Sequence, residues 1–102
     1  MIKSFQVQNS TPQEFITKIT NALSGRDLGK IVSMSTLENQ VVIAFSKLGK
    51  SEVIFSLKAE SSQFSCEHKS EKIAFTHKAL RSDIEAKLAK VLESAGATVV
   101  QG

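Results

Sequence analysis

The chain of 102 residues contains no tryptophan, no tyrosine, one proline and one cysteine. A lone cysteine, Cys66, excludes an internal disulfide, and no apolar run reaches the length that crosses a bilayer. Residues 1–5 lack the apolar stretch of a signal peptide. These absences predict a cytoplasmic protein that is not inserted into a membrane.

The aromatic content is restricted to phenylalanine, and large apolar side chains of this kind are mostly buried. We therefore expect the phenylalanines to fill a core rather than to stack on a ligand. At this length the chain forms one domain, residues 1–102, and fraying of the last few residues is one of two alternatives for its end. The phenylalanines are Phe5, Phe15, Phe45, Phe55, Phe64 and Phe75.

The densest apolar stretch, residues 41–57, indicates a β-hairpin. Runs rich in β-branched and aromatic residues flank the segment 47–50, where Gly49 can adopt the positive φ of a tight reversal. One face of the hairpin would be apolar on both strands and would require a cover. Its inward residues would be Val41, Ile43, Phe45, Val53, Phe55 and Leu57.

Two amphipathic helices are the predicted cover. The first begins near Ser10 or Thr11, with a capping box between Thr11 and Glu14 and Pro12 in the first turn, and ends at Gly25. The second begins either near residue 78 or at Ser82, which forms a capping box with Glu85, and ends at Gly96. Its apolar stripe is Leu80, Ile84, Leu88, Val91, Leu92 and Ala95, and its polar face is Glu85, Lys87, Lys90 and Glu93.

Further strands are predicted from two-residue alternation over residues 3–8, 30–36 and 64–69. In the second of these we take Val32 and Met34 as the inward side. Residues 73–75 continue the last strand past a bulge or form a separate short strand, and residues 98–100 form a final strand or a frayed tail. Both pairs of alternatives stay open.

This order predicts an α+β two-layer sandwich: an antiparallel meander sheet with two helices on one face, in the order β-α-β-β-β-β-α(-β). The order resembles that of TATA-binding-protein-like repeats and of the small polyhydroxyalkanoate-system domains. The resemblance concerns the topology by element order only and transfers no site residue.

No residues stand at a spacing that a known chemistry requires. Cys66 and His68 would share one strand face, and His77 follows, but structural zinc needs four ligands and a thiol nucleophile needs a nearby base. We predict no catalytic residue, no metal and no cofactor, and therefore a non-enzymatic protein.

The predicted function is binding through the sheet face that the helices leave uncovered. An apolar patch on an uncovered face usually marks an interface, so we expect a protein partner or self-association, with a homodimer as one form. The predicted interface residues are Val42, Ala44, Ile54 and Ser56, together with Ile31.

Two alternatives accompany this interpretation. The first is a small apolar ligand held between the sheet and the second helix, in a cavity lined by Phe45, Phe55, Phe75, Leu88 and Leu92. The second is weak, salt-sensitive nucleic-acid binding, since the net charge is +3, although Arg26 and Arg81 are the only arginines. Its basic rim would be Lys47, Lys50, Lys58, Lys69, Lys72, Lys78 and Arg81.

Overall fold

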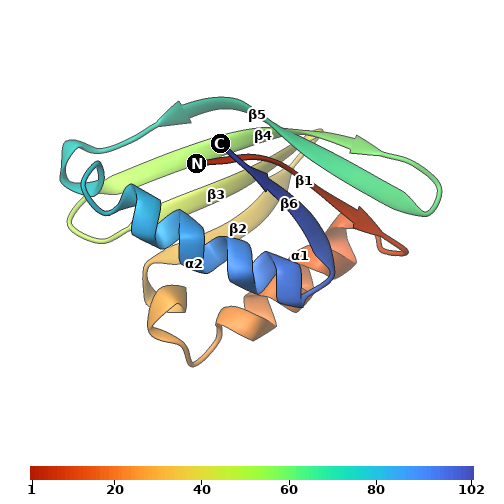
Figure 1. Ribbon diagram of the computed structural model, residues 1–102, viewed down its shortest axis with the longest axis horizontal. Coiled ribbons are helices and arrows are strands. Elements are labelled where there is room, and N and C mark those ends of the chain that lie inside the picture. The colour runs from red at the N-terminus through yellow and green to blue at the C-terminus, as the bar shows by residue number, and fades with distance from the viewer.

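A computed structural model describes all residues from Met1 to Gly102 (Figure 1). One six-stranded antiparallel sheet has both helices on the same side, and its strand order is β2-β3-β4-β5-β1-β6. The predicted fold class is therefore confirmed, and the likeness to TATA-binding-protein-like repeats rests on element order alone. The elements are β1 (Ile2–Gln8), α1 (Pro12–Leu23), the 3₁₀ turn η1 (Asp27–Lys30), β2 (Val32–Leu37), β3 (Gln40–Ser46), β4 (Lys50–Ala59), β5 (Gln63–Lys72), the 3₁₀ turn η2 (Phe75–His77), α2 (Arg81–Ser94) and β6 (Ala97–Gln101).

The hairpin of β3 and β4 forms the centre of the meander as predicted. Val42 pairs with Ile54 across it, and the turn runs from Ser46 to Lys50, with φ of +136° at Gly49 and +56° at Leu48. The inward side chains are buried, except that Leu57 is only partly covered. Those fully buried on the two strands are Val41, Ile43, Phe45, Val53 and Phe55.

Helix α1 begins and ends where the sequence predicts. Thr11 is the N-cap: its hydroxyl accepts from the Glu14 backbone N–H at 3.1 Å, and the Glu14 carboxylate accepts from the Thr11 N–H at 3.3 Å. Pro12 occupies the first helical position, and Gly25 follows the helix with a φ of +81°. The buried face of α1 joins a single core of 23 residues that also includes α2 and every strand.

Helix α2 differs from its prediction at its start. It begins at Arg81, Leu80 is the N-cap residue, and no side chain caps the helix, so the predicted Ser82–Glu85 capping box is wrong. Leu80 is 48% exposed, because the apolar stripe meets the core only from Ile84 onward. Glu85, assigned to the polar face, is buried, because Arg81 turns inward and provides a charged partner.

The strands show two further differences. Ile31 ends the 3₁₀ turn η1, so the second strand starts at Val32 and not at residue 30. Strand β5 runs on to Lys72, and residues 73–75 lie outside it; Phe75 belongs to η2 and is 86% exposed, so it is not the core residue that was expected. Residues 98–100 do form part of a strand, β6, which pairs with β1.

A bulge in β5 changes which side chains point toward the helices. Phe55 pairs with His68 and Ile54 pairs with Ser70, so one extra residue, Lys69, stands between them. Beyond the bulge Glu71 pairs with the buried Val53. Cross-strand partners point to the same face, so His68 and Glu71 both lie on the inward face. Without the bulge, two residues three apart on a strand would point to opposite faces.

Candidate interaction surface

The face of the sheet opposite the helices has no cover (Figure 1). At its centre Val42 pairs directly with Ile54, and these two side chains and Ala44 are partly exposed. Ser56, the fourth predicted interface residue, is exposed on the same face. The structure thus brings all four together on β3 and β4, whereas Ile31 lies before β2 against the core.

The strand register places small, uncharged side chains directly beside the central Val42–Ile54 pair, and Glu52 opposite Ala44 on the same face. Ser35 and Ser70 flank the Val42–Ile54 pair on β2 and β5. A neighbouring row crosses the whole sheet and ends in two exposed apolar side chains, Leu37 (63%) and Val100 (50%). We call this surface the open sheet face; that row is Leu37, Gln40, Ser56, Glu67, Ser4 and Val100.

The residues predicted to line an apolar cavity do not come together. Phe45, Phe55, Leu88 and Leu92 are buried in the single core. Phe75 lies on the surface, where the Lys78 ammonium is 5.9 Å from its ring centre. A cavity that includes all five is therefore excluded.

The predicted basic rim is divided between two ends of the sheet. Lys47, Lys50 and Lys78 lie at or near the β3–β4 turn, which η2 contacts through the hydrogen bond from Thr76 Oγ1 to the Leu48 carbonyl. Lys58 lies at the other end of β4, about 26 Å from Lys50 at the usual rise of a strand.

The remaining members of that rim also lie apart. Lys72 is opposite Glu52 on the open sheet face, and Lys69 stands at the bulge of β5. Arg81 is held in ion pairs with Glu71 and Glu85. The basic residues thus do not form one continuous positive rim.

Cys66 and His68 share the inward face of β5 but do not interact with each other as a reactive pair. Burial raises the pKa of the Cys66 thiol to about 12. The His68 Nε2 atom lies 2.8 Å from a Glu71 carboxylate oxygen, and a carboxylate only accepts, so this nitrogen donates. No group of three His, Cys, Asp or Glu side chains is placed to hold a metal ion.

We expect the Cys66 thiol of the native protein to resist alkylation. The thiolate is the reacting form, and burial both raises its pKa and blocks the reagent. Iodoacetamide labelling followed by mass spectrometry checks this, with urea-unfolded protein as the fully labelled control. Rapid labelling of the folded protein, at a rate near that of the unfolded chain, would contradict the buried position.

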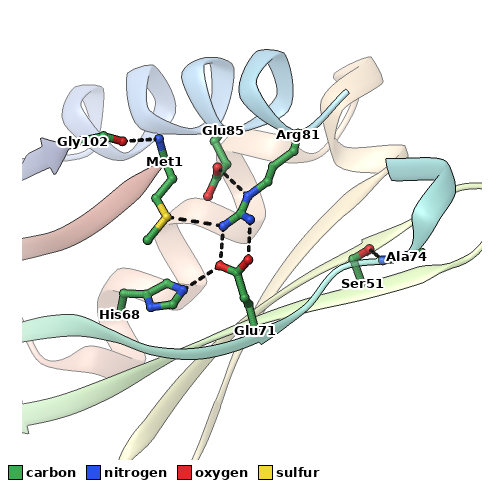
Figure 2. Close-up of polar contacts among 8 residues, drawn as sticks. All are labelled: Met1, Ser51, His68, Glu71, Ala74, Arg81, Glu85 and Gly102. Atoms are coloured by element: carbon green, nitrogen blue, oxygen red, sulfur yellow. Dashed lines mark hydrogen bonds and ion pairs between the residues drawn. The ribbon is translucent and has the colours of Figure 1, made fainter. Parts of the chain in front are cut away.

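A network of charged side chains joins β5 to α2 (Figure 2). The Glu71 carboxylate accepts two hydrogen bonds from the Arg81 guanidinium and one from His68. Arg81 Nε also donates to Glu85 at 3.1 Å, and Nη2, one of the two nitrogens that donate to Glu71, also contacts the Met1 sulfur. The hydrogen bonds from Arg81 hold the pKa of Glu71 below its usual value, and Glu71 in turn raises the pKa of Arg81.

A second polar cluster connects η2 to the hairpin. His77 is buried, with Nδ1 2.5 Å from Ser51 Oγ and Nε2 2.5 Å from the Lys47 carbonyl. The carbonyl only accepts, so Nε2 carries the hydrogen; Ser51 Oγ then donates to Nδ1 and accepts from the Ala74 N–H (Figure 2 shows the last bond). Every polar atom of the cluster has a hydrogen-bond partner, so we interpret the cluster as a structural contact that holds η2 against the hairpin.

Sequence reasoning missed both clusters. In the sequence His77 stands between Thr76 and Lys78, and nothing local connects it with Ser51, 26 residues earlier. Comparison with known proteins returned no matching family model, no matching curated protein and no matching solved structure.

Proposed function

We propose that this protein is a non-enzymatic interaction module that forms a homodimer through the open sheet face. The observation that supports this most directly is the part-exposed pair Val42 and Ile54 at the centre of a sheet face without a cover. Apolar side chains gathered on an uncovered face favour contact with a second apolar surface. A second copy offers such a surface, and a two-fold axis allows both patches to be used at once.

The charges around the patch are compatible with a second copy. Glu52 and Lys72 are cross-strand partners at one end of the face, and Lys58 and Glu67 lie toward the other end. Each end therefore presents both signs, and neither end repels its copy strongly. The face does not have the single-sign field that would favour nucleic acid over protein.

The size of the face favours a dimer of modest affinity. Six strands about 4.8 Å apart, with a mean length of about 25 Å, cover about 700 Å² in projection, slightly below the ~800 Å² per partner of a standard interface. We therefore expect dissociation on dilution. Added salt screens the repulsion between two chains of net charge +3, so association strengthens with salt, whereas nucleic-acid binding weakens.

The absence of enzymatic activity and a cytoplasmic location are part of the proposal. The buried thiol of Cys66 and the fully bonded Ser51–His77 pair leave these nucleophile types without access to a substrate. A lone cysteine suits a reducing compartment. Neither helix has the length and apolar character needed to cross a bilayer.

Sedimentation velocity from micromolar to millimolar concentration tests the dimer. We expect the wild type to associate reversibly. For Ile54→Lys we expect a dimer dissociation constant at least about tenfold higher than that of the wild type. A tenfold change corresponds to about 1.4 kcal/mol, and burying an unpaired lysine costs more than that.

The matched control is Leu48→Lys, which adds the same charge in the turn of the same hairpin and outside the open sheet face. Leu48 is 83% exposed. We expect it to leave the dissociation constant within about twofold. A wild type that stays monomeric at every concentration, or a control that weakens association as much as Ile54→Lys, would show that the open sheet face does not mediate self-association.

A further inference from the structure

Strand β2 is an edge of the sheet with free hydrogen-bonding groups along its outer side. It pairs with β3 alone. The Ser46 N–H donates to the Ile31 carbonyl, which identifies residues 31, 33, 35 and 37 as those bonded toward β3. The intervening residues, Val32, Met34 and Thr36, therefore direct their backbone N–H and C=O groups outward, where no strand accepts them.

This edge has none of the features that usually prevent strand addition. Edge strands that resist the addition of another strand usually carry lysine, proline or a bulge. Residues Val32–Leu37 include no charged residue and no proline, and their register with β3 is regular throughout. The charged residues of the sheet are instead concentrated in the inner strands β4 and β5.

A hollow of about 420 Å³ lies beside the same edge. Val32 and Met34 form its wall on the strand side, and the C-terminal end of α1 and the turn η1 form the other. Arg26 and Lys30 are its only charged lining residues; Lys30 forms an exposed ion pair with Asp27 at 3.6 Å, whereas Arg26 makes no ion pair. The remaining lining residues are Thr20, Leu23, Ser24, Gly25, Gly29 and Ser33.

We propose that β2 binds an extended acidic peptide segment of another protein as an added strand. The peptide backbone would bond to the outward groups of Val32, Met34 and Thr36, and every second side chain would face the hollow. A glutamate or aspartate side chain fits there, because the lining offers the unpaired Arg26 and hydroxyl groups, together with Lys30, whose pair with Asp27 is exposed, and contains no carboxylate of its own. This site lies on the sheet edge, so it is independent of a dimer formed through the open sheet face.

The test begins with the amide groups themselves. In native-state hydrogen exchange the N–H groups of Val32, Met34 and Thr36 are expected to exchange at least about tenfold faster than those of Ser33 and Ser35, which bond to β3. Equal protection of the two sets would mean that the edge is already satisfied, and the proposal would be wrong.

A phage library of random twelve-residue peptides, fused through their C-termini, then supplies the probe. Selection on the wild type should enrich sequences with Asp or Glu, and one synthetic peptide from them should slow exchange at Val32, Met34 and Thr36. Thr36→Pro removes an outward donor without breaking the bond to β3, and should lower affinity at least about tenfold, whereas Thr36→Val should not.

The charge requirement is tested with Arg26→Gln plus Lys30→Gln, against Lys50→Gln plus Lys58→Gln as a charge-matched control away from the hollow. We expect about tenfold weaker binding for the first pair and unchanged binding for the second. If Thr36→Pro does not fold, the exchange map and this pair decide the question alone. The proposal would be overturned if no peptide were enriched or if the selected peptides lacked acidic residues. It would also be overturned if Thr36→Pro abolished a dimer of the wild type, because a second copy of the chain would then be the occupant of the edge.

Discussion

Arg81→Met is expected to lower the free energy of unfolding by about 3 kcal/mol, because it leaves an uncompensated carboxylate between α2 and β5. The Glu85 side chain is only 4% exposed, and its charged partner is Arg81. Glu71 would lose both of its hydrogen bonds from the guanidinium. Methionine retains most of the apolar stem, so the loss reports the charged contacts. Urea denaturation of the wild type and the variant measures it.

The neighbouring ion pair of the same helix provides the control. Lys87 and Asp83 are 3.1 Å apart with side chains 63% and 68% exposed, so Lys87→Met is expected to change the stability by at most about 0.5 kcal/mol. Adding Glu85→Gln to Arg81→Met should recover part of the loss, because the buried charge is then gone. Equal effects of Arg81→Met and Lys87→Met would mean that the cluster contributes no more than a surface pair.

Acid should reduce the effect of Arg81→Met. The pKa of Glu71 is lowered in the folded protein, first by its hydrogen bonds from Arg81, so its stabilising contribution is present above the unfolded value of about 4.3. That contribution disappears as the pH falls through the folded pKa. The difference in stability between wild type and variant is therefore expected to narrow below about pH 4, and the same urea titrations in acid would show it.

The layers of this fold follow from local sequence patterns, whereas its departures from them depend on tertiary contacts. Alternation of apolar residues predicts the hairpin and its inward face, and Thr11 with Glu14 predicts the start of α1. The predicted Ser82–Glu85 capping box was wrong because Glu85 instead accepts from Arg81, which also pairs with Glu71, ten residues earlier in the chain. No helical periodicity contains that information.

The candidate sites divide in the same way. Val42, Ala44, Ile54 and Ser56 could be grouped from the sequence because the period of a strand alone places them on one face. The hollow beside β2 was not predicted. It forms because α1 and η1 pack next to β2, and β2 is an edge strand only because of the order of strands in the sheet. The residues of the predicted basic rim do not gather on one surface, because lysines close in sequence lie at opposite ends of long strands.

His77→Phe is expected to lower the free energy of unfolding by about 3 kcal/mol while retaining a ring of similar shape. The substitution removes both nitrogens from a buried site and leaves the Ser51 hydroxyl and the Lys47 carbonyl without their partner, at about 1–3 kcal/mol for each group.

The effect of His77→Phe should be concentrated at the β3–β4 turn, because His77 and Thr76 both bond to it. That turn contains Leu48 at a φ of +56°, a conformation that a residue with a side chain adopts at a cost of about 1–2 kcal/mol. Hydrogen exchange should therefore accelerate at residues 47–51 more than at β1. Thr76→Val, which removes only an exposed hydrogen bond to the same turn, is the control and should cost no more than about 1 kcal/mol. A His77→Phe variant as stable as Thr76→Val would show that the buried bonds of His77 do not hold the hairpin turn in place.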